Sequence, residues 1–393
     1  ILSTYQASSE EEKQEFFRML AGDYDIDLDT LQDTLQNYRE TQSSADLSHL
    51  LDAAEPKRQE VIRRINRAPG ATHSLVNMRE DLLAFIRSEK DLKRVDIDFE
   101  HLFGSWFNRG FLVLQPIDWN TPAHILEKVI KYEAVHEISD WSELQRRLEP
   151  SDRRCYAFFH PAVPSEPLIF VEVALTKSIP SAVDSVLRED RERVSENEAT
   201  TAVFYSISNC QKGLRGISFG NFLIKQVASE LASSLPNLDT FVTLSPVPGF
   251  VRWLKQKAEQ EPDSLFSSVY LGITSQSPHN KLAEIQNYKR ELISIAAHYL
   301  VIERHKDGLA VDPVARFHLG NGASLHAIHF EANLSPKGLE QSFGIMVNYR
   351  YDLAQVEANH EAYATRGDIQ APSEIHQLAM DSVKPVTKEN KHE

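Results

Sequence analysis

Residues 205–231 carry the strongest chemical signal in the chain, because glycines and basic residues lie there between a strand pattern and a helix pattern. The glycines follow the spacing GxxGxxxG: Gly213, Gly216 and Gly220. Free N–H groups at a helix start attract phosphate, and glycines let the backbone approach it. Lys212 and Arg215 add positive charge. The pattern is neither Walker A nor GxGxxG, so it predicts a pyrophosphate-binding turn; an ordinary turn with packing glycines is the alternative.

Ser245 is a candidate for a positioned hydroxyl. It follows the strand pattern at residues 239–244, and Pro246 and Pro248 restrict the backbone after it. No Gly-x-Ser-x-Gly turn surrounds it, which disfavours a nucleophile that forms an acyl-enzyme. Capping of the helix expected from Gly249 is the alternative role for this serine.

Three histidines lie eight and three residues apart in the C-terminal part: His318, His326 and His329. An imidazole titrates near neutrality and suits proton transfer as well as metal binding. A metal site usually adds a carboxylate or a cysteine at suitable reach, and Glu331 is nearby. We expect no metal, because an alternating strand with solvent-facing histidines also explains His326 and His329.

The sequence pattern that predicts secondary structure changes near residue 150. Before it, apolar residues recur three and four apart, which predicts helices, with Thr121 as the N-cap of one of them. After it, strand patterns alternate with helix patterns, including one long helix at 281–304. The predicted fold class is α plus α/β. We expect an all-helical domain at 1–150, a mixed α/β domain at 151–366 and a polar, frayed tail at 367–393.

Composition limits the partners and the compartment. The 393 residues contain 42 Lys and Arg against 57 Asp and Glu, a formal net charge of −15. Such a charge disfavours nucleic acid and anionic membrane surfaces. Two cysteines outside any CxxC pair exclude a zinc ribbon and fit a reducing compartment, and no run approaches the roughly 20 apolar residues of a membrane span. We expect a cytoplasmic protein; a mitochondrial location stays open, because a leader could precede Ile1.

The glycine turn resembles the acyl-CoA-binding turn of the GNAT acetyltransferase superfamily, Gln/Arg-x-x-Gly-x-Gly/Ala, with shifted glycine spacing at 211–216. Further stretches share an order and spacing with one family: FYSIS at 204–208, LSPVPGF at 244–250, PVARFHLGNGA at 313–323 and GIMVNYRY at 344–351. From about residue 200 to 353 the chain resembles the malonyl-CoA decarboxylase family. The resemblance implies a helical N-terminal domain, a GNAT-like catalytic domain and no cofactor beyond the CoA of the substrate.

The resemblance also implies the reaction, in which malonyl-CoA becomes acetyl-CoA and CO₂ through a thioester enolate. It places the proton donor at His318 and the carboxylate-orienting hydroxyl at Ser245, while Ser206 and Tyr351 complete the pocket. A proton-donating imidazolium predicts that activity falls as pH rises through the pKa of His318. The residues implied to contact CoA are Arg215, Gly216, Ile217, Ser218, Phe219, Gly220 and Asn221. Mammalian members carry Glu where Ser218 stands, which leaves its contribution open.

Two other functions remain open on the sequence. A GNAT-type N-acetyltransferase would share the CoA turn and need a groove for an amine acceptor. A non-catalytic acyl-CoA sensor would use the helical half as its interaction module. Product analysis separates the transferase from a decarboxylase, and tight acyl-CoA binding without turnover would favour the sensor. The helical domain is also expected to form a homo-oligomer.

Overall fold

The computed structural model describes residues 1–217, 219, 223–275 and 281–382. The chain divides into two compact units. The first contains Ile1–Gln115, Phe158–Ile169 and Asn209–Gly220, and the second contains Pro116–Ala157, Phe170–Ser208 and Asn221–Glu393. This division falls earlier along the chain than the change of sequence pattern near residue 150 predicts.

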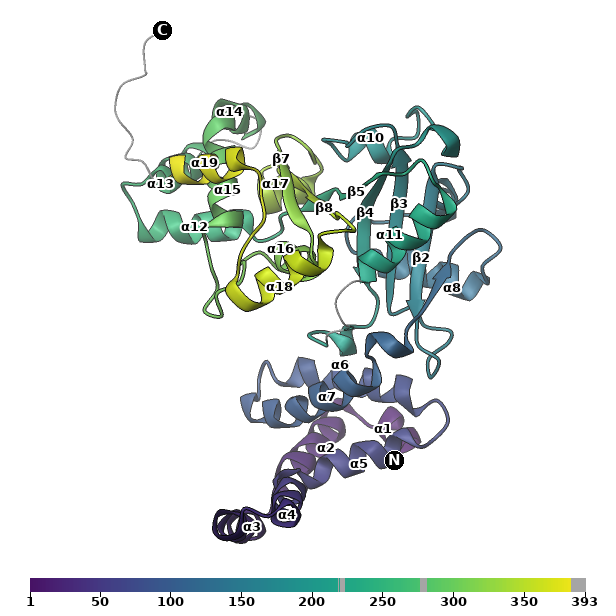
Figure 1. The fold of residues 1–393 in the computed structure, drawn as a ribbon, viewed down its shortest axis with the longest axis vertical. Coiled ribbons are helices and arrows are strands. Elements are labelled where there is room, and N and C mark those ends of the chain that lie inside the picture. The colour runs from purple at the N-terminus through teal and green to yellow at the C-terminus, as the bar shows by residue number, and fades with distance from the viewer. Residues whose placement is uncertain (218, 220–222, 276–280, 383–393) are drawn as a thin grey trace. The chain divides into compact units, whose positions relative to one another are not determined.

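The first unit is built from helices, purple and blue in Figure 1. They are α1 (Leu2–Ala7), α2 (Glu10–Gly22), α3 (Leu28–Thr41), α4 (Ser44–Ala54), α5 (Lys57–Asn66), α6 (Ala71–Phe85) and α7 (Lys93–Trp106), with short 3₁₀ turns η1 (Lys90–Leu92), η2 (Arg109–Phe111) and η4 (Lys212–Leu214). Helix α2 begins with a capping box, in which Ser9 and Glu12 bond each other's backbone N–H groups. Its Phe17 packs in a core with Leu75 and Phe99, all fully buried.

The strands form a mixed sheet. They are β1 (Val113–Pro116), β2 (Arg153–Phe159), β3 (Ile169–Thr176), β4 (Thr201–Asn209), β5 (Thr240–Thr243), β6 (Ser245–Pro246), β7 (Ser324–His329) and β8 (Met346–Arg350). Within the second unit the order is β2-β3-β4-β5-β8-β6, and β7 also pairs β8. Strands β4 and β5 are parallel, whereas β8 is antiparallel to β5, β6 and β7. Strand β8 therefore brings β6 and β7, distant in sequence, to one place.

Helices also surround the strands of the second unit (Figure 1). They are α8 (Ala123–Tyr132), α9 (Trp141–Leu148), α10 (Asp184–Leu187), α11 (Leu223–Ser234), α12 (Phe250–Gln260), α13 (Leu265–Thr274), α14 (Lys281–Asn287), α15 (Lys289–Val301), α16 (Pro313–Gly320), α17 (Pro336–Ser342), α18 (Val356–Arg366) and α19 (Ser373–Asp381), with the turn η3 (Glu196–Glu198). A helical first part followed by a mixed α/β part confirms the predicted fold class.

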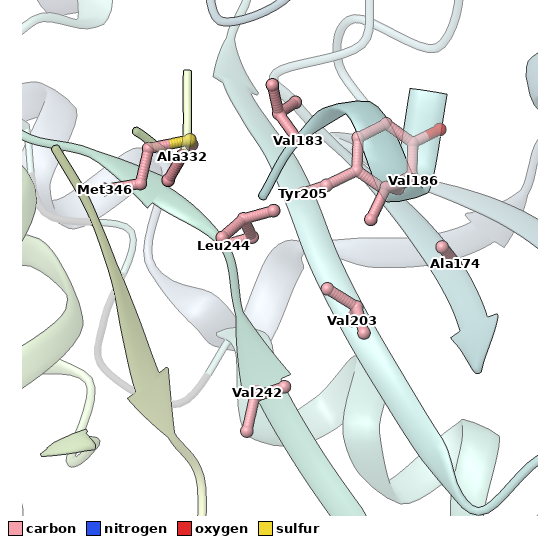
Figure 2. Close-up of a cluster of buried hydrophobic side chains, with 9 residues drawn as sticks. All are labelled: Ala174, Val183, Val186, Val203, Tyr205, Val242, Leu244, Ala332 and Met346. Atoms are coloured by element: carbon pink, nitrogen blue, oxygen red, sulfur yellow. The ribbon is translucent and has the colours of Figure 1, made fainter. Parts of the chain in front are cut away.

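One face of the sheet carries an apolar cluster, shown in Figure 2. Val203 and Tyr205 of β4 lie in it beside Val242 of β5. Because successive side chains of a strand point to opposite faces, Ser206 and Thr243 belong to the other face. The apolar cluster thus leaves Ser206 of β4 and Thr243 of β5 on the opposite side of the sheet.

The structure corrects three local predictions. Helix α8 begins after Pro122 without a side-chain cap, and the Thr121 hydroxyl instead accepts the N–H of Asp118 at 3.0 Å. The helix expected at 281–304 is two helices, since Tyr288 leaves the helical conformation and its ring packs where Gly272 of α13 has no side chain.

The third correction concerns the C-terminal segment. The predicted frayed tail is wrong for Ser373–Asp381, which form α19 against α15. Ile375 and Ala379 of this helix are buried, and the Ser294 hydroxyl of α15 donates to the carbonyl of Leu378 at 2.5 Å. Two apolar positions four residues apart make a helix face, which the polar composition of this segment conceals.

Candidate active site

His318 is held in the last turn of the short helix α16. Asp312 caps the start of this helix, because its Oδ1 accepts the N–H groups of Val314 and Ala315 at 2.9 and 3.0 Å. Pro313 occupies the first turn, where its missing N–H is not needed. The imidazole is buried and stacks on the ring of Tyr349, with centroids 4.7 Å apart. Local capping and packing therefore fix one position for the ring.

Both nitrogens of His318 meet hydroxyl groups. Nε2 lies 3.0 Å from Oγ of Ser245, and Nδ1 lies 2.8 Å from the hydroxyl of Tyr351. The Ser245 hydroxyl donates to Oγ1 of Thr243 at 2.8 Å, so its oxygen is left to accept from the imidazole. Nε2 then carries the proton, and Nδ1 accepts from Tyr351. The structure thus brings together three residues that the resemblance names: Ser245, His318 and Tyr351.

Burial sets the charge state of this trio. It lowers the pKa of His318 to about 3 and raises the pKa of Tyr351 well above its usual value. At neutral pH the site holds a neutral imidazole and a protonated tyrosine. The resting imidazole is therefore not the proton donor itself, and a proton must reach it before it can act as an acid.

Ser245 is positioned by the sheet rather than by a helix. It lies in β6, opposite Val347 of β8. Its partner Thr243 ends β5 and accepts the N–H of Tyr349 at 3.0 Å. No cap of α12 comes from Ser245, since the cap residue is Gly249. The structure thus assigns this serine to the imidazole and not to the alternative capping role.

Asp312 also ties the neighbouring segments to α16. Its second oxygen accepts the N–H of Gly249 at 3.4 Å and the hydroxyl of Tyr299 at 3.2 Å. A Cβ at position 249 would lie 2.4 Å from the Tyr299 hydroxyl, so only glycine fits there. These contacts connect the loop after Ser245 with the helix that carries His318.

Ser206 has a different partner, Glu133, which follows α8. The Ser206 hydroxyl lies 2.9 and 2.7 Å from the two carboxylate oxygens, and Glu133 Oε1 also accepts the N–H groups of Val135 and His136 at 2.7 Å each. Among the described residues no hydrogen bond joins Ser206 to His318. Sequence reasoning missed Glu133; a carboxylate at the unfavourable C-terminal end of a helix was the available signal.

The glycine turn packs against α6. The Arg79 guanidinium donates to the carbonyls of Gly213 and Arg215, both at 2.8 Å. A Cβ on Gly213 would lie 1.8 Å from the carbonyl oxygen of Val76, so the packing alternative holds for this glycine. Gly216 adopts φ of 82°, a conformation that favours glycine.

The structure describes only some of the other residues predicted to contact CoA. The side chain of Arg215 is exposed, whereas Ile217 and Phe219 are buried. Ser218, Gly220 and Asn221 lie outside the described residues.

The histidines of β7 make separate contacts. Nε2 of His329 hydrogen-bonds Oδ1 of Asn348, and His326 is half-buried. Within 1–217, 219, 223–275 and 281–382, no group of three or more His, Cys, Asp or Glu side chains is arranged to hold a metal ion. Across those same ranges, none of the helices combines the length and apolar character needed to cross a membrane.

A buried imidazole between two hydroxyls, carried by a mixed α/β domain, is an arrangement typical of one class of protein, the enzymes that transfer a proton in a site shielded from water. Comparison with known proteins narrows this class. The family model of the malonyl-CoA decarboxylase C-terminal domain matches residues 110–392, and that of the N-terminal domain matches 24–107. The chain belongs to the malonyl-CoA decarboxylase family, as the sequence motifs predict.

Curated relatives and solved structures agree with this assignment. The mitochondrial malonyl-CoA decarboxylases of Anser anser anser and Rattus norvegicus are 36% and 35% identical, over 81% and 82% of this chain and 69% and 71% of theirs. The crystal structure of malonyl-CoA decarboxylase from Rhodopseudomonas palustris is 51% identical, with a TM-score of 0.90 over 96% of this chain and 92% of that one. The enzyme from Cupriavidus metallidurans is 36% identical, with a TM-score of 0.75 over 96% and 92%.

Proposed function

We propose that this chain converts malonyl-CoA to acetyl-CoA and CO₂, with His318 delivering the proton and Ser245 orienting the carboxylate. The observation that carries the proposal is the contact of both His318 nitrogens with hydroxyls, Ser245 at 3.0 Å and Tyr351 at 2.8 Å. Cleavage of the carbon–carbon bond releases CO₂ and leaves its electron pair in a thioester enolate. One proton, taken from solvent, must then reach the carbon.

The charge state of His318 changes when the substrate binds. Burial keeps the free imidazole neutral, but a bound carboxylate within about 4–6 Å favours the charged form and raises the pKa. In the substrate complex the ring takes up a proton and can pass it from Nε2 to the enolate carbon. The Tyr351 hydroxyl holds Nδ1 and keeps Nε2 directed at Ser245. Proton delivery of this kind contributes roughly 10²–10⁴ in rate.

The pH dependence of catalysis follows from this scheme. Since the reacting form is the protonated imidazole of the substrate complex, we expect kcat to fall as pH rises through the pKa of His318 in that complex. A kcat that stays flat from mildly acid to mildly alkaline solution would contradict proton delivery by His318.

The CoA part of the substrate is proposed to bind at the stretch predicted from the sequence, from Arg215 to Asn221. Gly216 in its left-handed conformation and the exposed cation of Arg215 support this, because backbone N–H groups and a nearby cation suit phosphate. Ser206, held by Glu133, is proposed to line the acyl end of the pocket. We propose no cofactor beyond the CoA of the substrate and no metal.

The predicted oligomeric state and the predicted compartment also remain proposals. We propose a homo-oligomer formed through the helical part, because α3 and α4 bury no side chain and expose Leu28 and Leu51 to 73% and 63%. We also propose a cytoplasmic location, since Cys155 and Cys210 are not joined in a disulfide.

The test of the proposed function is product analysis. Purified protein, malonyl-CoA and a metal chelator should yield acetyl-CoA and CO₂ without any amine acceptor. Ser245→Ala should lower kcat by roughly 10²–10³, the loss typical when a group that stabilises the reacting charge is removed. Acetyl transfer to an amine without CO₂ release would favour an N-acetyltransferase, and tight binding without turnover would favour a sensor; either result overturns the proposal.

A further inference from the structure

An arginine-rich cavity of about 140 Å³ lies in the second unit, apart from the hydroxyl–imidazole site. Its lining comes from α9, the start of β2, α10 and the loop that follows α10. Six arginines line it: Arg146, Arg147, Arg153, Arg188, Arg191 and Arg193. Only two acidic residues join them, Glu143 and Glu189. In a chain with a net charge of −15 this concentration of cations requires a physical reason.

Ion pairing within the protein accounts for part of the cluster. Arg147 pairs with Glu143 at 2.5 Å and with Glu172 at 3.1 Å, while Arg191 pairs with Asp152 at 2.9 Å. A further pair joins Arg188 and Asp190 at 2.6 Å. The six guanidinium groups are accompanied by five carboxyl groups, which are the four ion-pair partners just named and Glu189 of the lining. The cavity therefore keeps positive charge after its internal pairs are made.

Two of the arginines are available for a ligand. Arg146 and Arg193 are exposed, and neither has a hydrogen-bond or ion-pair partner among the residues that the structure describes. A guanidinium presents several N–H donors in a fixed plane that matches phosphate and carboxylate. Both unpartnered guanidinium groups line the same cavity and supply free N–H donors there.

Buried polar atoms behind the cavity also lack partners. Oε1 of Glu172 and the hydroxyl of Tyr205 are buried without a hydrogen bond inside the described part of the chain. Glu172 contacts Arg147, and the Arg153 guanidinium lies 5.8 Å from the Tyr205 ring centre. Burial raises the pKa of Glu172 to about 8.

The cavity is separate from the residues proposed for catalysis. The backbone carbonyl of Asp152 accepts the N–H of Leu175, and the backbone N–H of Thr200 donates to the carbonyl of Thr176. The start of β2, the end of β3 and the start of β4 therefore lie at the same end of the sheet, and Arg153 lies there. Ser206 lies five residues after Thr201, the first residue of β4, which is roughly 16 Å of extended strand. An anion at the arginines is therefore not the carboxylate that Ser245 and His318 would hold.

We propose that the arginine-lined cavity between α9, α10 and the start of β2 binds a small molecule bearing clustered phosphate or carboxylate groups. Its volume corresponds to roughly five water molecules at about 30 Å³ each, which suits two or three such groups. A larger molecule would leave its remaining part in solvent. The site is independent of the decarboxylase proposal, because it shares no residue with it.

The test is calorimetric titration of the full-length protein with pyrophosphate and, separately, with citrate at fixed ionic strength. Saturating CoA is present throughout, so that the substrate's own phosphate site is occupied. The variant is Arg146→Gln combined with Arg193→Gln, because both side chains are exposed and the fold should survive. Arg290→Gln is the matched control, an exposed arginine at the start of α15 that does not line the cavity.

We expect at least one probe to bind, the double variant to bind it at least about tenfold more weakly, and the control to match the wild type. Pyrophosphate binding alone would identify a phosphorylated ligand, and citrate binding alone a polycarboxylate. Acetyl-CoA formation should be unchanged in both variants. Absence of binding for both probes, or equal binding by the double variant, would show that the arginines serve only the fold.

Discussion

The buried, neutral His318 makes a specific prediction about stability in acid. Burial depresses the folded-state pKa from 6.5 to about 3, whereas in the unfolded chain the same imidazole takes up a proton near pH 6.5. Below that pH the unfolded state binds more protons, so the free energy of unfolding decreases as pH falls from about 6.5 to about 3. Each pH unit in this window costs about 1.4 kcal/mol, which is about 2 kcal/mol at pH 5.

The assay compares wild type with His318→Asn by urea denaturation at pH 7.5 and pH 5. The variant lacks the titrating group. Its free energy of unfolding should therefore decrease from pH 7.5 to pH 5 by about 2 kcal/mol less than that of wild type. His136 is also buried with a lowered pKa, but it is present in both proteins and cancels. His124→Asn, an exposed histidine of α8, is the matched control and should behave as wild type. Equal losses in wild type and His318→Asn would refute a neutral imidazole in the folded state.

Two further predictions follow from contacts around the ring. Tyr351→Phe removes the hydroxyl that holds Nδ1 of His318, so kcat should fall by roughly 10- to 100-fold with little change in KM, as steady-state kinetics would show; an unchanged kcat would remove Tyr351 from the account. Gly249→Ala places a Cβ 2.4 Å from the Tyr299 hydroxyl and should destabilise the protein by about 1–3 kcal/mol, seen as a lower thermal midpoint; a midpoint equal to wild type would mean that the loop shifts freely.

Much of the fold was accessible from the sequence because its signals are local. Periodicity of three and four predicts the N-terminal helices, and strand patterns that alternate with helix patterns predict the mixed α/β part. Local signals failed where a tertiary contact decides the outcome. Tyr288 interrupts a continuous helix pattern because its ring fits against Gly272, and α19 becomes ordered because Ala379 is buried against α15.

The trio of Ser245, His318 and Tyr351 shows the same limit. The sequence itself singles out Ser245 and His318, and the family resemblance adds Tyr351, but separations of 73 and 33 residues carry no signal that the three side chains meet. What brings them together is the pairing of β6 with β8 and the capping of α16 by Asp312. The charge of the resting His318 depends on complete burial, which its neighbours in sequence do not reveal.

Glu133 illustrates a residue that sequence reasoning passes over. Its carboxylate accepts the Ser206 hydroxyl from 73 positions away and backbone N–H groups two and three residues ahead. Before folding it is one acidic residue among 57. Arg79 is similar, because its role in holding the carbonyls of Gly213 and Arg215 depends on a separation of more than 130 residues.

The most direct measurement of the central claim is kcat for acetyl-CoA formation from malonyl-CoA by wild type and His318→Asn, with CoA binding measured on the same samples. Proton delivery by His318 predicts a loss of roughly 10²–10⁴ in kcat while the variant still binds CoA as tightly as wild type. A variant that retains wild-type kcat would contradict the assignment of His318 as the group that protonates the enolate.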